Sequence, residues 1–172
     1  IRNPELTLRL VNPYSKCIAE FDKRRFIQII TNYVTNAIKY TPKGEIVMGY
    51  ECTPNQMRFY VKDTGIGIPE AKKHRIFNRF EKLDNFAQGT GLGLSICKAI
   101  ADATGGEVGF ESTENVGSEF WYIGYTNVEY VEKAEGVDLS EDLAEEPIAD
   151  TCAEEICDLD ILVAEDNDSN FR

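Results

Sequence analysis

Apolar residues recur at helical spacing in one long segment of the chain. Between residues 23 and 40 they follow the i, i+3, i+4, i+7 pattern, which predicts an amphipathic helix with a continuous buried face. Asp22 stands before the first periodic residue and is a good N-cap, and Phe21 and Phe26 are placed to form a hydrophobic staple. The segment 41–44, Thr-Pro-Lys-Gly, is expected to end the helix, because proline disfavours helical backbone at the residue before it.

Strands are predicted on both sides of this helix, where apolar and polar positions alternate. In chain order we expect a hairpin of strands 6–11 and 17–21 around a turn at 12–15, the long helix, strands 45–52 and 57–62, a short helix near 70–77, a helix at 92–103, and strands 107–111 and 118–125. This order favours an α/β fold, namely a two-layer sandwich of a mixed sheet with helices on one face.

Charge is concentrated in one part of the chain. The 172 residues carry a net charge of −12 from 18 basic and 30 acidic residues. Residues 129–160 hold thirteen acidic residues and one basic residue, so this stretch accounts for the excess. We therefore expect a folded domain at residues 1–126, a solvated acidic linker at 127–159 and the first strand of a further domain at 160–172. A partner-binding acidic tail is the alternative interpretation of the linker.

Composition also argues against several classes of protein. The acidic balance disfavours a nucleic-acid-binding protein that relies on phosphate contacts. No apolar run reaches the roughly 18–20 residues needed to cross a bilayer, so we expect no direct membrane contact. The five cysteines form an odd set without a CxxC pair, which supports neither a disulfide framework nor a zinc site and favours reduced thiols in the cytoplasm. Cys17, Cys52 and Cys97 lie in apolar segments and are expected in the core.

The predicted long helix carries a polar stripe beside its apolar face. Asn32, Asn36 and Lys39 are spaced by four and three residues, so they lie on one side of the helix. Amide oxygens can ligate a hard cation, and an ammonium group can contact phosphate, which together suit a magnesium nucleotide. A solvated helix edge is the alternative interpretation.

Two glycine-rich segments follow the helix. Asp63 ends a predicted strand and precedes Thr-Gly-Ile-Gly-Ile-Pro at 64–69, so its carboxylate would lie where backbone can approach a ligand closely. The alternative is a simple Asp-Gly turn. Residues 89–93, Gly-Thr-Gly-Leu-Gly, open a predicted helix whose N-terminal N–H groups would favour phosphate. This segment is neither a Walker A loop nor a GxGxxG fingerprint, and a flexible joint is the alternative.

Four segments follow one another along the chain: Asn36-Ala-Ile-Lys39-Tyr40-Thr41, Asp63-Thr-Gly-Ile-Gly-Ile-Pro69, Phe77-Asn-Arg-Phe80 and Gly89-Thr-Gly-Leu-Gly-Leu-Ser95. In this order and spacing they closely resemble the N, G1, F and G2 boxes of the ATP-binding domain of sensor histidine kinases. That family belongs to the Bergerat (GHKL) fold group, with the Hsp90 chaperones, type II topoisomerases and MutL repair proteins. The resemblance covers roughly residues 5–126 and implies that ATP lies between the long helix, the two glycine segments and a mobile lid.

The resemblance implies a role for each matching residue. It makes Asn36 the Mg²⁺ ligand with Asn32 beside it, Lys39 a phosphate contact, and Asp63 the acceptor for the adenine amino group. The remaining implied contacts are Tyr40 against the adenine or ribose, Ile68 in the nucleotide pocket, Gly65 and Gly67 beside the base, Phe77 and Phe80 as lid anchors, Arg79 or Lys82 at the γ-phosphate, and Gly89, Thr90, Gly91, Leu92 and Gly93 at the lid hinge and the phosphates.

One position bears on the type of reaction. In the hydrolysing relatives of this fold group, a glutamate four residues before the magnesium asparagine activates water, whereas this chain has Asn32 there. An amide does not accept a proton at neutral pH, so water attack would lack a general base. The resemblance thus implies phosphoryl transfer to a protein histidine in two-component signalling. The alternatives are a regulatory nucleotide-binding module without phosphotransfer and an Hsp90-like ATPase.

The implied partners lie on other segments. The family's acceptor histidine sits on a dimerisation helix before this domain, so we expect His74, the only histidine, to be structural. Residues 161–167, Ile-Leu-Val-Ala-Glu-Asp-Asn, resemble the first strand and acidic pair of a receiver domain, which implies a truncated receiver at 160–172 and a hybrid kinase as the parent. We expect ATP, a dimerisation domain and a receiver domain as partners. The fragment is expected to be monomeric and cytoplasmic, with a parent compatible with an inner-membrane anchor.

Overall fold

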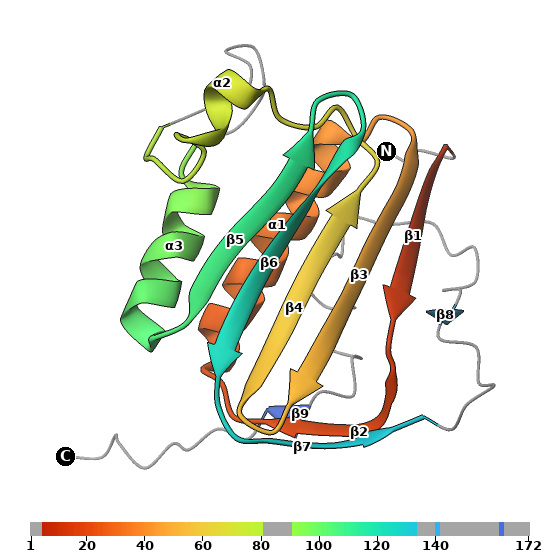
Figure 1. Ribbon diagram of the computed structural model, residues 1–172, viewed down its shortest axis with the longest axis vertical. Helices are drawn as coiled ribbons and strands as arrows, with labels where there is room; N and C mark the ends of the chain where they lie inside the picture. The colour runs from red at the N-terminus through yellow and green to blue at the C-terminus, as the bar shows by residue number, and fades with distance from the viewer. Residues whose placement is uncertain (1–4, 81–90, 134–139, 142–161, 164–172) are drawn as a thin grey trace.

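The main sheet has six strands, and helices cover one of its faces (Figure 1). The computed structural model describes residues 5–80, 91–133, 140–141 and 162–163. The elements in chain order are β1 Leu6–Val11, β2 Tyr14–Ala19, α1 Lys23–Tyr40, β3 Gly44–Thr53, β4 Gln56–Asp63, α2 Glu70–Lys73, α3 Gly93–Thr104, β5 Glu107–Thr113, β6 Gly117–Tyr125, β7 Val128–Glu132, β8 Ser140–Glu141 and β9 Leu162–Val163.

Strand order confirms the predicted mixed sheet. The order is β5-β6-β4-β3-β1-β8, in which β1 and β3 run parallel and every other neighbouring pair is antiparallel. Figure 1 shows α1 and α3 on the same face, and the two helices pack against each other. The α/β sandwich with helices on one face is therefore present.

Helix α1 forms as its sequence predicts. The Asp22 carboxylate caps it by accepting a hydrogen bond of 3.0 Å from the backbone N–H of Arg25. The rings of Phe21 and Phe26 stack with centroids 5.1 Å apart, which is the predicted staple. Its buried residues follow the predicted spacing and face the sheet: Phe26, Ile29, Ile30, Tyr33, Val34 and Ala37. This packing fixes the direction of the polar stripe on the same helix.

The predicted hairpin of the first two strands is wrong. Strand β1 pairs in parallel with β3, and β2 lies in a second, three-stranded sheet of order β7-β2-β9. Asn12 turns the chain between them, since its side-chain oxygen accepts a hydrogen bond from the backbone N–H of Tyr14. Alternation of apolar residues shows that a strand has one buried face, but it does not identify the neighbouring strand.

The first residues of the predicted linker are not an extended solvated segment, because Val128–Glu132 forms strand β7 and pairs antiparallel with β2. Val128 is buried and the ring of Tyr130 packs against Tyr14, whereas Glu129 is exposed. The alternation was present in this short segment, but the surrounding acidic residues obscured it. Except for the two-residue strands β8 and β9, residues 134–172 lie outside the described residues, and the domain boundaries remain predictions.

Helix α2 is shorter than predicted, because its helical backbone ends at Lys73 instead of continuing to about residue 77. Helix α3 ends at Gly105, which adopts the left-handed conformation with φ of 70° and donates its N–H to the carbonyl of Ala101. In the part of the chain that the structure describes, no helix is both long and apolar enough to cross a membrane.

Candidate functional site

Residues from four parts of the chain lie beside the C-terminal half of α1. They come from α1 itself, the last residue of β4, the loop that follows it, and the N-terminus of α3. The backbone N–H of Ile66 donates to the carbonyl of Tyr40 at 3.1 Å, which joins the loop to α1. The Oδ1 atom of Asn32 lies so near Gly93 that a Cβ atom there would be only 2.7 Å away. The three predicted segments are therefore neighbours in space.

Asp63 is a buried carboxylate at the end of β4. Its side chain accepts a 2.8 Å hydrogen bond from the backbone N–H of Gly65, and the residue is only 7% exposed. Burial raises the pKa of Asp63, and the backbone N–H groups of Gly65 and Ser118 oppose that shift. A carboxylate has about four acceptor positions, so acceptor capacity remains for a ligand donor.

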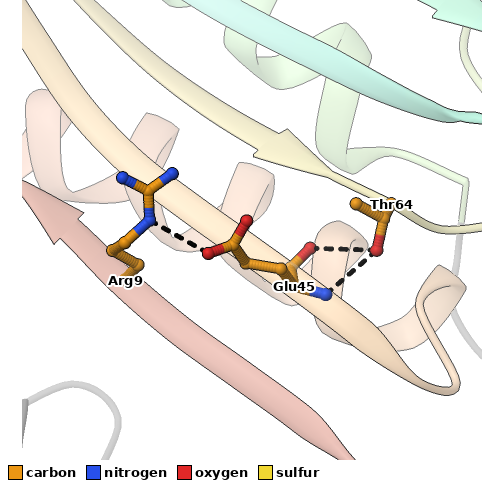
Figure 2. A network of polar contacts seen from close by, with 3 residues as sticks. All are labelled: Arg9, Glu45 and Thr64. Carbon is orange, nitrogen blue, oxygen red and sulfur yellow. Dashed lines mark hydrogen bonds and ion pairs between the residues drawn. The ribbon is translucent and has the colours of Figure 1, made fainter. Parts of the chain in front are cut away.

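A polar network holds the turn after Asp63 against the neighbouring strands. The hydroxyl oxygen of Thr64 accepts a hydrogen bond of 2.9 Å from the backbone N–H of Glu45 (Figure 2). The same Glu45 pairs through its carboxylate with Nε of Arg9 at 2.9 Å. These contacts connect the turn to β3 and β1, which positions the backbone of Asp63 and Gly65.

Thr41 is a polar residue of this site that stands in the N-box segment and at the predicted helix end, but to which the sequence assigned no contact. It is fully buried, and its hydroxyl oxygen makes no hydrogen bond within the described residues. The hydroxyl lies near enough to Asp63 to favour its charged form, but not in hydrogen-bonding geometry. Buried polar atoms nearly always have a partner, so an unpaired one points to a ligand or a water molecule. Its position directly after Tyr40 was the available signal.

Gly65 and Gly67 allow the loop to lie very near its neighbours, because neither residue has a side chain. A Cβ atom on Gly65 would lie 2.3 Å from the carbonyl oxygen of Tyr40 and 2.9 Å from Oδ1 of Asp63. Gly67 has a φ of 64°, and a Cβ atom there would lie 2.0 Å from the carbonyl oxygen of Thr113. The predicted contact Ile68 is buried, and its N–H donates to the hydroxyl of Ser112, so it anchors the loop.

Asn32, the first residue of the stripe on α1, faces the N-terminus of α3. The Nδ2 atom of Asn32 donates to the carbonyl of Gln28 at 3.0 Å, and its oxygen lies toward Gly93. Asn36 is half-buried one turn later, and the exposed Lys39 holds its Nζ 4.9 Å from the ring centroid of Tyr40. The stripe therefore presents amide oxygen and ammonium groups along one side of the site.

These donors suit a magnesium ion that is shared with a phosphate ligand. Within the described ranges no group of three or more His, Cys, Asp or Glu residues is placed to hold a metal. Magnesium usually keeps several waters and binds through one or two protein oxygens plus substrate phosphates. The amide oxygens of Asn36 and Asn32 fit that kind of site better than a site made by protein ligands alone.

The N-terminus of α3 carries no side-chain cap. The side chain of its N-cap residue Leu92 has no hydrogen-bond acceptor, and Gly93 begins the helix without a Cβ atom. The first N–H groups of a helix have no intrahelical partner and carry partial positive charge, so they favour phosphate. Gly91 has a φ of 71°, and its carbonyl accepts from the N–H of Phe80, which joins the two sides of the predicted lid.

The predicted lid anchors differ in burial. Phe77 packs edge-on against Phe110 with centroids 5.9 Å apart, whereas Phe80 is 73% exposed. Arg79 is exposed as well. The predicted contacts Lys82, Gly89 and Thr90 lie outside the described residues.

Comparison with known proteins decides the family. A model described as "Histidine kinase-, DNA gyrase B-, and HSP90-like ATPase" matches residues 21–124, which include α1, both glycine segments and α3. The chain belongs to this family. Within it, the chain is 37% identical to the circadian input-output histidine kinase CikA of Synechococcus elongatus over 124 residues, which are 68% of this chain and 16% of CikA. It is 42% identical to the signal transduction histidine-protein kinase BarA of Escherichia coli over 110 residues, 59% of this chain and 12% of BarA.

Solved structures of histidine kinases share the fold of this family member. Full-length ShkA in complex with AMPPNP matches with a TM-score of 0.62 and 30% identity, over 74% of this chain and 26% of ShkA. The nucleotide-free catalytic domain of histidine kinase ThkA matches with a TM-score of 0.53 and 39% identity, over 60% of this chain and 68% of that domain. The chain spans 12% to 16% of the two curated kinases above, so it corresponds to one part of each.

Proposed function

We propose that this domain binds Mg-ATP and donates the γ-phosphoryl group to a histidine on a separate dimerisation domain in two-component signalling. The observation that carries the proposal is the buried carboxylate of Asp63 beside the unpaired hydroxyl of Thr41, at the end of α1 whose polar stripe leads to the uncapped end of α3. Family membership and the AMPPNP complex of the similar kinase ShkA support a nucleotide as the ligand.

The two ends of the site would bind different parts of ATP. Asp63 would accept a hydrogen bond from the adenine amino group, and the absence of a side chain at Gly65 lets the loop lie close against Tyr40 and Thr41 beside that carboxylate. The phosphates would lie between Lys39 and the N-terminal N–H groups of α3. Tyr40, whose ring is near Lys39, would pack against the base or the ribose.

Asn36 would hold the magnesium ion through its amide oxygen, with Asn32 as the second oxygen of the stripe. The ion would supply positive charge that offsets the charge on the phosphates during transfer. The remaining contribution of this chain is positioning, because the amide side chain of Asn32 does not take a proton from water at neutral pH. This arrangement favours a protein acceptor over water.

The acceptor would lie on another segment. His74 is exposed at the C-cap of α2. We also propose a cytoplasmic, monomeric fragment of a hybrid kinase, in which residues 160–172 begin a receiver domain. The resemblance of residues 161–167 to a receiver strand supports this last part.

A transfer assay tests the function. The chain is mixed with a separately produced dimerisation segment that carries the histidine, and γ-labelled ATP is added with magnesium. We expect acid-labile, base-stable label on that segment, and none when its histidine is replaced by glutamine. Tight nucleotide binding without label would show a regulatory module instead, and release of free phosphate would show an ATPase.

Asn36→Ala tests the metal site. We expect this variant to lose about tenfold in ATP affinity with magnesium present, equivalent to about 1.4 kcal/mol, and to match the unaltered chain when EDTA removes the ion. Isothermal calorimetry measures both. Asn55→Ala, in the exposed turn between β3 and β4 at the far end of the hairpin, is the matched control and should bind normally in both conditions. An equal loss with and without EDTA would remove Asn36 from the metal site.

Thr41→Val tests the unpaired hydroxyl. Valine keeps the shape of threonine and removes a buried polar atom without a partner, so thermal stability should stay equal or rise slightly. If the hydroxyl binds the nucleotide directly or through water, affinity falls about 2- to 10-fold, the value of one neutral hydrogen bond. Thr41→Ser keeps the hydroxyl and should restore binding. Unchanged affinity in the valine variant would show that the hydroxyl does not contact the ligand.

A further inference from the structure

Two thiols from different sheets lie against each other at the end of the molecule away from the candidate site. Cys17 belongs to β2 of the three-stranded sheet, and Cys52 lies near the end of β3 in the six-stranded sheet. Their sulfur atoms are 3.5 Å apart, a distance at which one thiol donates a hydrogen bond to the other. Cys17 is 4% exposed, and Cys52 is half-buried. The pair is therefore enclosed and has one edge toward solvent.

The surrounding residues hold this pair in place. The hydroxyl oxygen of Tyr14 accepts a 2.7 Å hydrogen bond from the backbone N–H of Cys52. The ring of Tyr14 packs between Tyr50 and Tyr130, with centroids 5.5 Å and 5.1 Å away. Because Tyr14 and Cys17 share strand β2, these contacts fix β2 against the end of β3 and keep the two sulfur atoms together.

The two thiols differ in acidity. The hydrogen bond from Cys52 lowers the pKa of Cys17, and the same contact together with burial raises the pKa of Cys52. The favoured ionised form of the pair is thus a Cys17 thiolate that accepts a hydrogen bond from a Cys52 thiol. A thiolate is the form that reacts with oxidants.

We propose that Cys17 and Cys52 form a redox modification site, which hydrogen peroxide converts into an intramolecular disulfide that joins β2 to β3. The sulfur of Cys17 attacks one peroxide oxygen, the O–O bond breaks, and hydroxide leaves as water after taking a proton. The sulfur of Cys52 then attacks the sulfenic sulfur of Cys17, its thiol proton goes to the departing oxygen, and a second water is released. Two thiols are oxidised and one peroxide is reduced to two waters.

The geometry permits this bond with small movements. A disulfide bond measures about 2.05 Å, so the sulfur atoms must approach by about 1.5 Å, and we expect rotation of the two side chains to supply this movement. The bond would close a loop that contains all of α1 and would fasten the three-stranded sheet to the main sheet. Cross-linking residues this far apart in sequence restricts the unfolded chain and stabilises the folded one.

This proposal is independent of the proposed function. Cys52 pairs with Met57 at one end of the β3–β4 hairpin, whereas Asp63 pairs with Ile46 at the other. Six residues along β4 separate the two rows, a distance of about 20 Å at about 3.4 Å per residue. The test therefore measures the oxidation state of the thiols and does not require nucleotide binding.

The experiment uses the full chain with Cys152→Ser and Cys157→Ser, which removes the two thiols outside the described residues. The folded protein is treated with hydrogen peroxide, denatured, and labelled with N-ethylmaleimide. The reduced chain should take up three labels and the oxidised chain one, at Cys97. Burial raises the pKa of Cys97 to about 12, so that thiol should not react with peroxide in the folded chain and should remain available for the label. Trypsin should release residues 17–23 linked to residues 44–58, and a reductant should separate them.

Variants and a stability measurement complete the test. Cys52→Ser should abolish the linked peptide, and Cys97→Ala should leave it unchanged. Oxidation should raise the melting temperature by about 5–15 °C in the chain with both thiols and not in Cys52→Ser. Absence of the linked peptide, a link through Cys97, or a stable sulfinic acid on Cys17 without a link would each overturn the proposal.

Discussion

Replacing Asp63 with asparagine should weaken ATP binding roughly 5- to 150-fold, equivalent to about 1–3 kcal/mol, while the domain stays folded. The Oδ1 atom of Asp63 already accepts the backbone N–H of Gly65. In the asparagine variant the amide oxygen would keep that contact, and the NH₂ group would replace the second carboxylate oxygen. Two donors would then face each other where the adenine amino group is expected, so the loss arises from an unpaired ligand donor and not from lost packing.

Folding should respond in the opposite sense to binding. Burial raises the pKa of Asp63 above its ordinary value of 3.8, so the unfolded chain releases this proton at a lower pH than the folded chain. The carboxylate thus reduces stability as the pH rises above 3.8, until the folded form has also ionised. Asparagine has no such charge, so we expect an equal or higher melting temperature for the variant at neutral pH and a weaker decline of stability above pH 4.

Asp102→Asn is the matched control for this change. Asp102 lies on the outer side of α3 and pairs with Lys98 in an exposed i, i+4 contact. Exposed pairs of this kind contribute at most about 1 kcal/mol, so both affinity and stability should be nearly unchanged. Calorimetry with ATP and thermal unfolding across pH measure the two quantities. Normal ATP affinity in the Asp63→Asn variant would rule out the assigned contact with adenine.

Local signals in the sequence predicted α1, α3 and the β3–β4 hairpin well, whereas α2 is shorter than predicted. The cap at Asp22, the Phe21–Phe26 staple and the periodic residues of α1 each act within a few positions of the chain, so one sequence contains all the information. Pairing of β1 with β3 and of β2 with β7 joins segments far apart in sequence. Their alternation defines a buried face, but packing of the whole domain decides which strand lies beside it.

The same distinction applies to the site. The order of the motifs predicted that Asp63, the glycines and the α1 stripe belong to one site, and the structure places them beside the C-terminal half of α1. The buried hydroxyl of Thr41 was not foreseen, because burial of one atom depends on neighbours from other elements. The pairing of Cys17 with Cys52 was missed for the same reason, since their spacing matches no metal or redox motif.

The strongest test of the adenine pocket is Gly65→Ala, which should reduce ATP affinity more than tenfold. No positive φ is involved at this position, so the effect is one of space alone. A methyl group would lie 2.3 Å from the carbonyl oxygen of Tyr40 and 2.7 Å from the hydroxyl oxygen of Thr41. Neither contact is tolerable, so the loop must move away from α1, which displaces the backbone beside the Asp63 carboxylate where the base is expected.

Gly105→Ala separates crowding at this site from a general effect of replacing glycine. Gly105 ends α3 with a φ of 70°, but a Cβ atom there would meet nothing within 4 Å. This control should lose about 1 kcal/mol of stability from backbone strain and should keep its ATP affinity. Gly65→Ala should lose stability by a similar or larger amount, about 1–3 kcal/mol for overpacking, and should lose binding as well. Calorimetry at a temperature where both variants are folded distinguishes them. Equal affinities would mean that the space beside Asp63 is not where the purine lies.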